Sequence, residues 1–110
     1  MVDESIEQSV KRYLHAVRQT GIHATRAVLY GSRARGTAGA DSDSDIDLIV
    51  IAAEFDRAPD RALVERLWQL RARTDHRIEP VPCGEAEWAT PITARTLIEI
   101  AHREGIEIAA

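Results

Sequence analysis

The chain has 110 residues, of which 45% are hydrophobic and 29% charged, and this composition is ordinary for a protein that folds in water. With 18 acidic against 14 basic residues, its net charge of −4 argues against binding nucleic acid through bulk charge. Cys83 is the single cysteine, no secretory signal is visible, and no apolar run approaches the roughly 20 residues of a membrane span, so we expect one cytoplasmic domain over residues 1–110 without a disulfide.

The chain begins with a predicted helix over residues 5–19. Its apolar residues recur at helical spacing, Ser5 and Gln8 have the spacing of a capping box, and Gly21 marks the end. Residues 25–30 then read as an apolar strand.

A polar segment separates this strand from a second one. Residues 31–36, Gly-Ser-Arg-Ala-Arg-Gly, are typical of a turn or one short helical turn, and residues 37–44 of a polar loop. Residues 45–51 predict a buried strand, because their second half is continuously apolar.

The second half of the chain adds two helices and two strands. Pro59 suits the start of a helix that ends near Arg73, and residues 76–82 look extended, with two prolines that indicate an edge or irregular strand. The pattern then predicts a helix over residues 91–103, a C-cap at Gly105 and a short edge strand over residues 106–108. The order α-β-β-α-β-α-β indicates an α/β (α+β) fold with helices packed against one small sheet.

Asp45 and Asp47 are the first candidates for a functional site. Residues i and i+2 of a strand point to the same face, so the two carboxylates would project side by side at the start of the second strand. Adjacent carboxylates repel unless a cation lies between them, and Mg²⁺ commonly takes one or two carboxylates together with substrate phosphates.

Gly31 and Ser32 open a turn that is a plausible place for such phosphates, because exposed backbone N–H groups and the neighbouring Arg33 and Arg35 would face them. The alternative is that the acidic residues Asp41, Asp43, Asp45 and Asp47 form only a solvated loop. A calcium loop beginning at Asp41 fits poorly, since the required glycine and glutamate are absent.

Together, Gly31-Ser32 followed about a dozen residues later by Asp45-Ile46-Asp47 resembles the signature of the DNA polymerase beta-like nucleotidyltransferase superfamily. The resemblance covers residues 28–51 closely. The short length is similar to that of minimal nucleotidyltransferases, which are often paired with a HEPN-domain toxin.

The resemblance implies a role for each matched residue. Gly31 and Ser32 would hold the β- and γ-phosphates of ATP, and Asp45 and Asp47 would bind two Mg²⁺ ions, although the sequence does not distinguish Mg²⁺ from Mn²⁺. Catalysis would then consist mainly of positioning and charge neutralisation.

The family also uses a third carboxylate on a later strand. Glu79 is the best candidate for this catalytic metal ligand, and Asp75, at the expected helix-to-strand turn, is the alternative. Arg33 and Arg35 are candidate phosphate contacts, with Arg33 favoured. The four histidines have no cluster spacing, so we expect no zinc site.

The implied reaction transfers AMP from ATP to an acceptor. The first hypothesis is an antitoxin that modifies the hydroxyl of a tyrosine of a HEPN-domain toxin. The second is a small-molecule acceptor such as an aminoglycoside. The third is a non-catalytic antitoxin that acts by binding alone. No direct nucleic-acid or membrane partner is expected, and a homo- or hetero-oligomer stays open.

Overall fold

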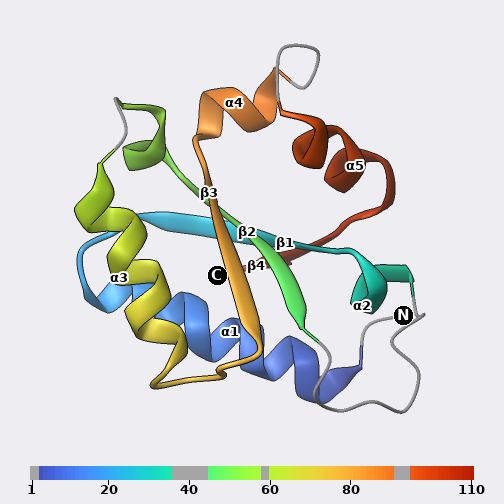
Figure 1. Ribbon diagram of the computed structural model, residues 1–110, viewed down its shortest axis with the longest axis horizontal. Helices are drawn as coiled ribbons and strands as arrows, with labels where there is room; N and C mark the ends of the chain where they lie inside the picture. Colours follow the sequence, from blue (N-terminus) through green and yellow to red (C-terminus); the bar gives the residue numbers. More distant parts are fainter. Residues whose placement is uncertain (1–2, 36–44, 58–59, 91–94) are drawn as a thin grey trace.

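A four-stranded mixed sheet forms the centre of the computed structural model, which describes residues 3–35, 45–57, 60–90 and 95–110. The strand order is β3-β2-β1-β4 (Figure 1). β1 is antiparallel to both β2 and β4, whereas β2 and β3 are parallel. The strands are β1 (Ala24–Tyr30), β2 (Ile46–Ala52), β3 (Ile78–Cys83) and β4 (Ile106–Ala109). The predicted small mixed sheet is confirmed.

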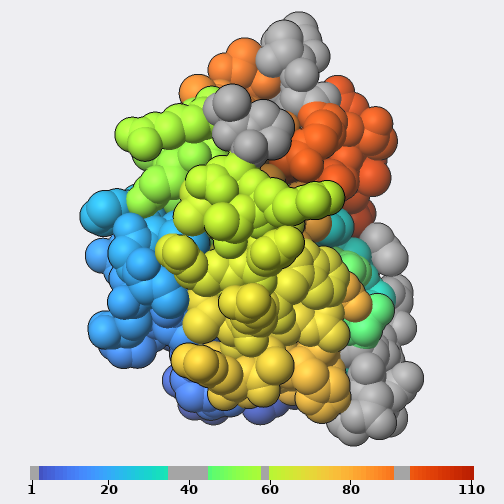
Figure 2. All heavy atoms as spheres, turned by 60° about the vertical axis from the view of Figure 1, so that its left-hand side comes forward, coloured from blue at the N-terminus to red at the C-terminus, as the bar shows by residue number. Residues whose placement is uncertain are grey.

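One face of the sheet packs against α1 (Glu4–Gln19) and α3 (Arg61–Arg71). Alternate residues of β2 point to this side, where Ile46, Leu48 and Val50 are buried in the larger of two apolar clusters. Figure 2 shows α3 on the outside of the molecule, beside α1. Of the helices in the described ranges, none is long and apolar enough to cross a membrane.

The other face is covered by two helices that form a second apolar cluster with Ile49 and Ile51 of β2 (Figure 1). These are α4 (Glu85–Ala89) and α5 (Thr96–Glu104). The sequence did not predict α4 or a 3-10 turn, η1 (Ala53–Asp56). A short helix, α2 (Ser32–Arg35), follows β1, which is one of the two forms predicted for residues 31–36.

The predicted cap of α1 needs correction, and the structure also shows which residue caps α3. Ser5 and Gln8 do not cap α1; instead Asp3 accepts a hydrogen bond from the backbone N–H of Ser5 at 2.8 Å. Asp60 caps α3 in the same way by accepting from Ala62 N–H at 3.0 Å. A carboxylate at the N-cap satisfies N–H groups that have no partner in the helix. The loop 37–44, Gly36, Pro59 and the start of the predicted helix 91–103 lie outside the described residues.

The predicted helix ends at Gly21 and Gly105 are confirmed, for different reasons. Gly21 follows the C-cap of α1 with φ +95°, a conformation that favours glycine. Gly105 has an ordinary negative φ, but a Cβ there would collide with Ala101 O and Val28 Cγ1. Here glycine allows the end of α5 to approach β1.

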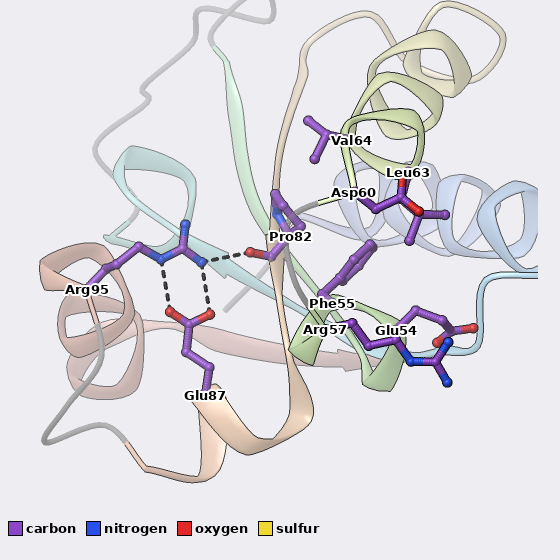
Figure 3. Close-up of a pocket in the computed structure, with 9 residues that line it drawn as sticks. All are labelled: Glu54, Phe55, Arg57, Asp60, Leu63, Val64, Pro82, Glu87 and Arg95. Carbon is purple, nitrogen blue, oxygen red and sulfur yellow. Dashed lines mark hydrogen bonds and ion pairs between the residues drawn. The ribbon is translucent and has the colours of Figure 1, made fainter.

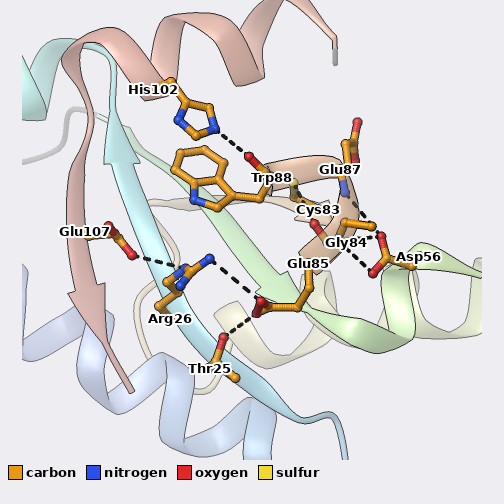
Figure 4. A network of polar contacts seen from close by, with 11 residues as sticks. Thr25, Arg26, Asp56, Cys83, Gly84, Glu85, Glu87, Trp88, His102 and Glu107 are labelled. Carbon is orange, nitrogen blue, oxygen red and sulfur yellow. Dashed lines mark hydrogen bonds and ion pairs between the residues drawn. The ribbon is translucent and has the colours of Figure 1, made fainter. Parts of the chain in front are cut away.

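The 3-10 turn positions α4 through one carboxylate (Figure 4). Asp56 accepts hydrogen bonds from the backbone N–H groups of Ala86, at 3.0 Å, and Glu87, at 3.4 Å, in the first turn of α4. Gly84 makes this possible, because a Cβ there would lie 2.9 Å from Asp56 Cα and overlap its carboxylate. At the other end, the Trp88 ring stacks on His102 of α5 with centroids 3.6 Å apart.

β3 forms one edge of the sheet and contains Pro80 and Pro82. The carbonyl of Arg77 accepts from Ile46 N–H at 2.8 Å, so the backbone groups of residues 77, 79, 81 and 83 face β2 and those of 78, 80 and 82 face outward. The predicted proline-marked edge strand is therefore confirmed, with both prolines on the outward positions.

Candidate active site

Asp47 and Glu79 lie in one row across the sheet. In the register of β1, β2 and β3, Tyr30 is opposite Asp47 and Asp47 is opposite Glu79. All three side chains point to the face that also carries α4 and α5, because they alternate with residues buried on the α1 face. The backbone thus brings two of the predicted carboxylates to neighbouring positions.

Gly31 lies directly against Asp47. It has φ +76°, and a Cβ at this position would overlap Asp47 Oδ2 and lie 3.2 Å from Asp47 Cγ. Only glycine both adopts this conformation readily and leaves room for the carboxylate. The predicted phosphate-binding turn and the predicted metal ligand are therefore adjacent in space as well as matched in sequence.

The other residues of the predicted site are close to Gly31 or Asp47 in the sequence, except Glu79. Asp45 is exposed and immediately precedes β2, which begins one residue later than expected. Ser32 and Arg33 are half-buried in α2, and Arg35 ends that helix. Hydrogen bonds with Ser5 lower the pKa of Asp3, and the positive charge of Arg33 adds a smaller effect in the same direction. Arg33 therefore also interacts with the carboxylate that caps α1.

Glu79 has a cationic neighbour that the sequence did not reveal. Its Oε2 lies 3.6 Å from Arg71 Nη1, at the end of α3. Within the described ranges, no group of three or more His, Cys, Asp or Glu side chains is arranged to hold a metal ion. The oxygen donors of Asp45, Asp47 and Glu79 suit Mg²⁺ chemically, but Glu79 pairs with Arg71 in this conformation.

The pKa of Tyr30 depends on its burial and on the charged side chains around Asp47 and Glu79. Its pKa is raised, first by burial and then by the negative charge of Asp47 and Glu79, while the positive charge of Arg95 acts in the opposite direction. The phenol therefore stays protonated near neutral pH. Tyr30 packs against the second apolar cluster, as expected for a residue beside the turn.

Asp75, the alternative third carboxylate, is engaged elsewhere. It is buried before β3, and its Oδ2 pairs with Arg77 Nη2 at 2.6 Å while its Oδ1 accepts from Arg77 Nε at 2.9 Å. Side-chain hydrogen bonding from Arg77 holds the pKa of Asp75 well below its usual value, against the opposing effect of burial. This carboxylate supports the entry into β3.

A separate cavity of about 230 Å³ lies at the other end of β3 (Figure 3). Phe55, Leu63, Val64 and Pro82 supply its apolar lining. On its rim, Arg95 pairs with Glu87 at 2.9 Å and donates to Pro82 O at 2.8 Å. Since Asp47 and Glu79 are near the first residues of β2 and β3, this cavity is not the carboxylate site.

The sequence did not reveal that Arg71 pairs with Glu79 or that the charge of Arg95 acts on Tyr30. Arg71 is on α3 and meets Glu79 of β3 only after folding. Arg95 precedes α5 and acts on Tyr30 of β1. No local motif or spacing links either arginine to the carboxylates, so nothing in the sequence could have singled them out.

Comparison with known families places most of the chain in one of them. Residues 10–102 match the family described as "Nucleotidyltransferase domain". This range contains all four residues of the Gly-Ser and Asp-x-Asp signature. A comparison with characterised protein sequences found no significant match.

Solved structures with the same fold include three toxin–antitoxin crystal structures. One, described as a toxin–antitoxin with AMP-PNP, has a TM-score of 0.60 and 23% identity, covering 93% of this chain and 71% of that one. A tyrosine-to-alanine mutant of the toxin–antitoxin MntA-HpeT has a TM-score of 0.56 and 22% identity, covering 88% and 68%. A mutant of MntA-HpeT in which two aspartates are changed to glutamate has a TM-score of 0.56 and 19% identity, covering 93% of this chain and 70% of that one.

The family match and the fold agree with the local geometry, in which a glycine-serine turn lies against a strand carboxylate. The chain belongs to the nucleotidyltransferase domain family, and it shares its fold with chains of the MntA-HpeT toxin–antitoxin structures.

Proposed function

We propose that this nucleotidyltransferase transfers AMP from ATP to a hydroxyl of a partner protein. The observation that carries the proposal is the contact between Gly31 and Asp47, which puts the turn that would bind phosphate against a carboxylate that would bind metal. A nucleoside triphosphate needs both, because its phosphates require backbone donors and its charge requires cations.

The residues of the turn would bind the triphosphate. Gly31 allows the backbone to approach, and Ser32 offers a hydroxyl and an N–H to the β- and γ-phosphates. Arg33 and Arg35 supply positive charge on the same short helix. These contacts would hold the α-phosphorus in place for attack.

The carboxylates Asp45, Asp47 and Glu79 would hold two Mg²⁺ ions. Mg²⁺ bound there would neutralise the triphosphate and favour ionisation of the acceptor hydroxyl. Glu79 would also accept the proton of that hydroxyl. The acceptor oxygen forms a bond to the α-phosphorus as the bond to pyrophosphate breaks, so AMP is transferred and pyrophosphate leaves.

We further propose that the acceptor is a tyrosine of a HEPN-domain toxin, which the chain would neutralise as its antitoxin in the cytoplasm, where ATP is available. The toxin–antitoxin structures that share the fold support this choice, one of them with the ATP analogue AMP-PNP. Their low identity leaves the partner as part of the proposal.

Label transfer tests the activity. The purified protein is incubated with ATP labelled at the α-phosphate, Mg²⁺ and lysate of the source cell, beside Asp45→Asn and Asp47→Asn. One labelled protein band with wild type only is expected, and its mass identifies the acceptor. Glu79→Gln should lower labelling by about 100-fold or more, as for the loss of a general base.

Two other outcomes would contradict parts of the proposal. ATP binding that depends on Asp47, without a labelled protein, would favour a small-molecule acceptor such as an aminoglycoside. Neutralisation of the toxin by Asp45→Asn as efficiently as by wild type would favour an antitoxin that acts by contact alone.

A further inference from the structure

We propose that Arg71 is a positioning residue that keeps Glu79 away from the metal site, so that a metal ion must displace Arg71 to gain its third carboxylate. The inference concerns regulation of the proposed site and rests on the proposed role of Glu79 as a metal ligand. It explains why Glu79, which the register of the strands places beside Asp47, pairs with a guanidinium instead.

The backbone of Glu79 lies beside Asp47, whereas its side chain pairs with Arg71. By register, Glu79 is the neighbour of Asp47 on the same face of the sheet. Its Oε2, however, lies 3.6 Å from Arg71 Nη1. Within the described part of the chain, no three potential ligands are arranged to hold a metal. The position of Glu79 therefore suits a metal ligand, whereas its present partner is a guanidinium.

Arg71 is held in place from its other side. Its Cζ lies 4.8 Å from the centroid of the Trp68 ring, one turn earlier on α3. A guanidinium over an indole is attracted by the negative face of the ring. Arg71 also lies in the last turn of α3, where the helix dipole favours a cation. Trp68 is 41% exposed, so its ring is available at the surface for this contact with Arg71.

The pair is suited to being broken. The side chains of Arg71 and Glu79 are 25% and 35% exposed, so water screens their attraction. A divalent cation attracts Glu79 more strongly than the single charge of Arg71 and repels Arg71 itself. Glu79 would thus exchange Arg71 for the metal when Mg²⁺ and the triphosphate bind, which would keep the site incomplete until then.

Metal affinity tests this exchange without any turnover. Mn²⁺ binding to the full chain is measured by the loss of the free-ion EPR signal, for wild type, Arg71→Met and Arg73→Met. Methionine keeps an apolar stem beside Trp68 but removes the charge. Arg73→Met is the matched control, because Arg73 is exposed, close in sequence and equal in charge.

Arg71→Met is expected to bind Mn²⁺ about two- to fivefold more tightly than wild type, the range given by losing one exposed ion pair. Arg73→Met should stay within about twofold, and the gain should vanish when Glu79→Gln is added to Arg71→Met. Equal or weaker binding by Arg71→Met, with binding still dependent on Asp47, would overturn this inference alone. Wild-type binding that Asp47→Asn leaves unchanged would overturn the metal site and the inference with it.

A second measurement follows the conformational change. In ¹H–¹⁵N spectra, the indole N–H signal of Trp68 should shift as diamagnetic Mg²⁺ and a non-hydrolysable ATP analogue are added to wild type, since the loss of the ion pair with Glu79 changes the position of Arg71 over the ring. The shift should be absent in Arg71→Met. A Trp68 signal that does not move in wild type, while signals of the Gly31 turn do, would contradict the exchange.

Discussion

At the scale of single residues, Gly21 and Gly31 form a natural comparison. Both have positive φ, but a Cβ at Gly21 would have no atom within 4 Å, whereas one at Gly31 would collide with Asp47. Gly21→Ala should cost about 1–2 kcal/mol of stability through backbone strain alone and leave ATP binding intact. Gly31→Ala should cost at least as much and abolish ATP binding. Urea denaturation and ATP titration of both variants measure the two effects, and ATP binding by Gly31→Ala equal to that of Gly21→Ala would refute the role of this contact.

The Asp75–Arg77 pair predicts a response to acid. Because the pKa of Asp75 is lowered on folding from its usual value of 3.8, its stabilising effect is complete above that value and is lost as pH falls below it. Asp75→Asn should remove about 1.5–3 kcal/mol, typical of hydrogen bonds to a charged group, at neutral pH. Thermal denaturation between neutral pH and pH 3 should show the difference between wild type and Asp75→Asn shrinking with acid. A constant difference over this range would show that the charge of Asp75 contributes nothing.

Single residues also show what could be predicted from the sequence. Gly31, Asp45 and Asp47 belong to a local motif within 17 positions, so their roles could be proposed from the sequence alone, and the structure adds that Gly31 and Asp47 are in contact. Glu79 could be predicted only as one of two carboxylates near a strand, and the pairing of Asp75 with Arg77 became visible only in the structure. Arg71 could not be predicted, because a counter-ion on another element leaves no periodic pattern.

At the scale of elements, α4 depends on a residue outside itself. Its five residues are too few to be stable alone, and Asp56 of η1 supplies acceptors for its first N–H groups. Asp56→Ala should therefore destabilise the protein by about 0.5–2 kcal/mol, the usual effect of losing an N-cap. Asp56→Asn should retain most of the stability, since an amide oxygen also accepts. Urea denaturation of the two variants measures this, and equal losses in both would mean that the charge of Asp56, and not its hydrogen bonds, is what matters.

The elements that were missed share a physical cause. The strands and long helices contain enough apolar residues to show their period, and all four strands were found within one or two residues of their ends. α4 and η1 are each shorter than two helical turns, so no period can develop. They form because Asp56 and Gly84 meet in the folded chain.

For the molecule as a whole, the two ends of the parallel strands β2 and β3 differ in chemistry. The first residues of β2 and β3 carry the carboxylates, and the last residues of β3 border the cavity beneath Arg95. The packing of α1 and α3 on one face leaves the other for α4 and α5. The candidate carboxylates Asp47 and Glu79 thus project from strands of the sheet, which hold them in place more precisely than a loop would.

The outer edge of β3 has a consequence for how the protein behaves in a crowded solution. Along Ile78–Pro82, the outward N–H of Ile78 is bonded to Asp75 O, and Pro80 and Pro82 have no N–H to offer. Arg95 occupies the carbonyl of Pro82 as well. A strand of another chain that approached this edge would find no N–H donor to pair with, so the sheet cannot gain a strand there. The strand that carries Glu79 is therefore protected from fibril growth and strand exchange by its own backbone chemistry.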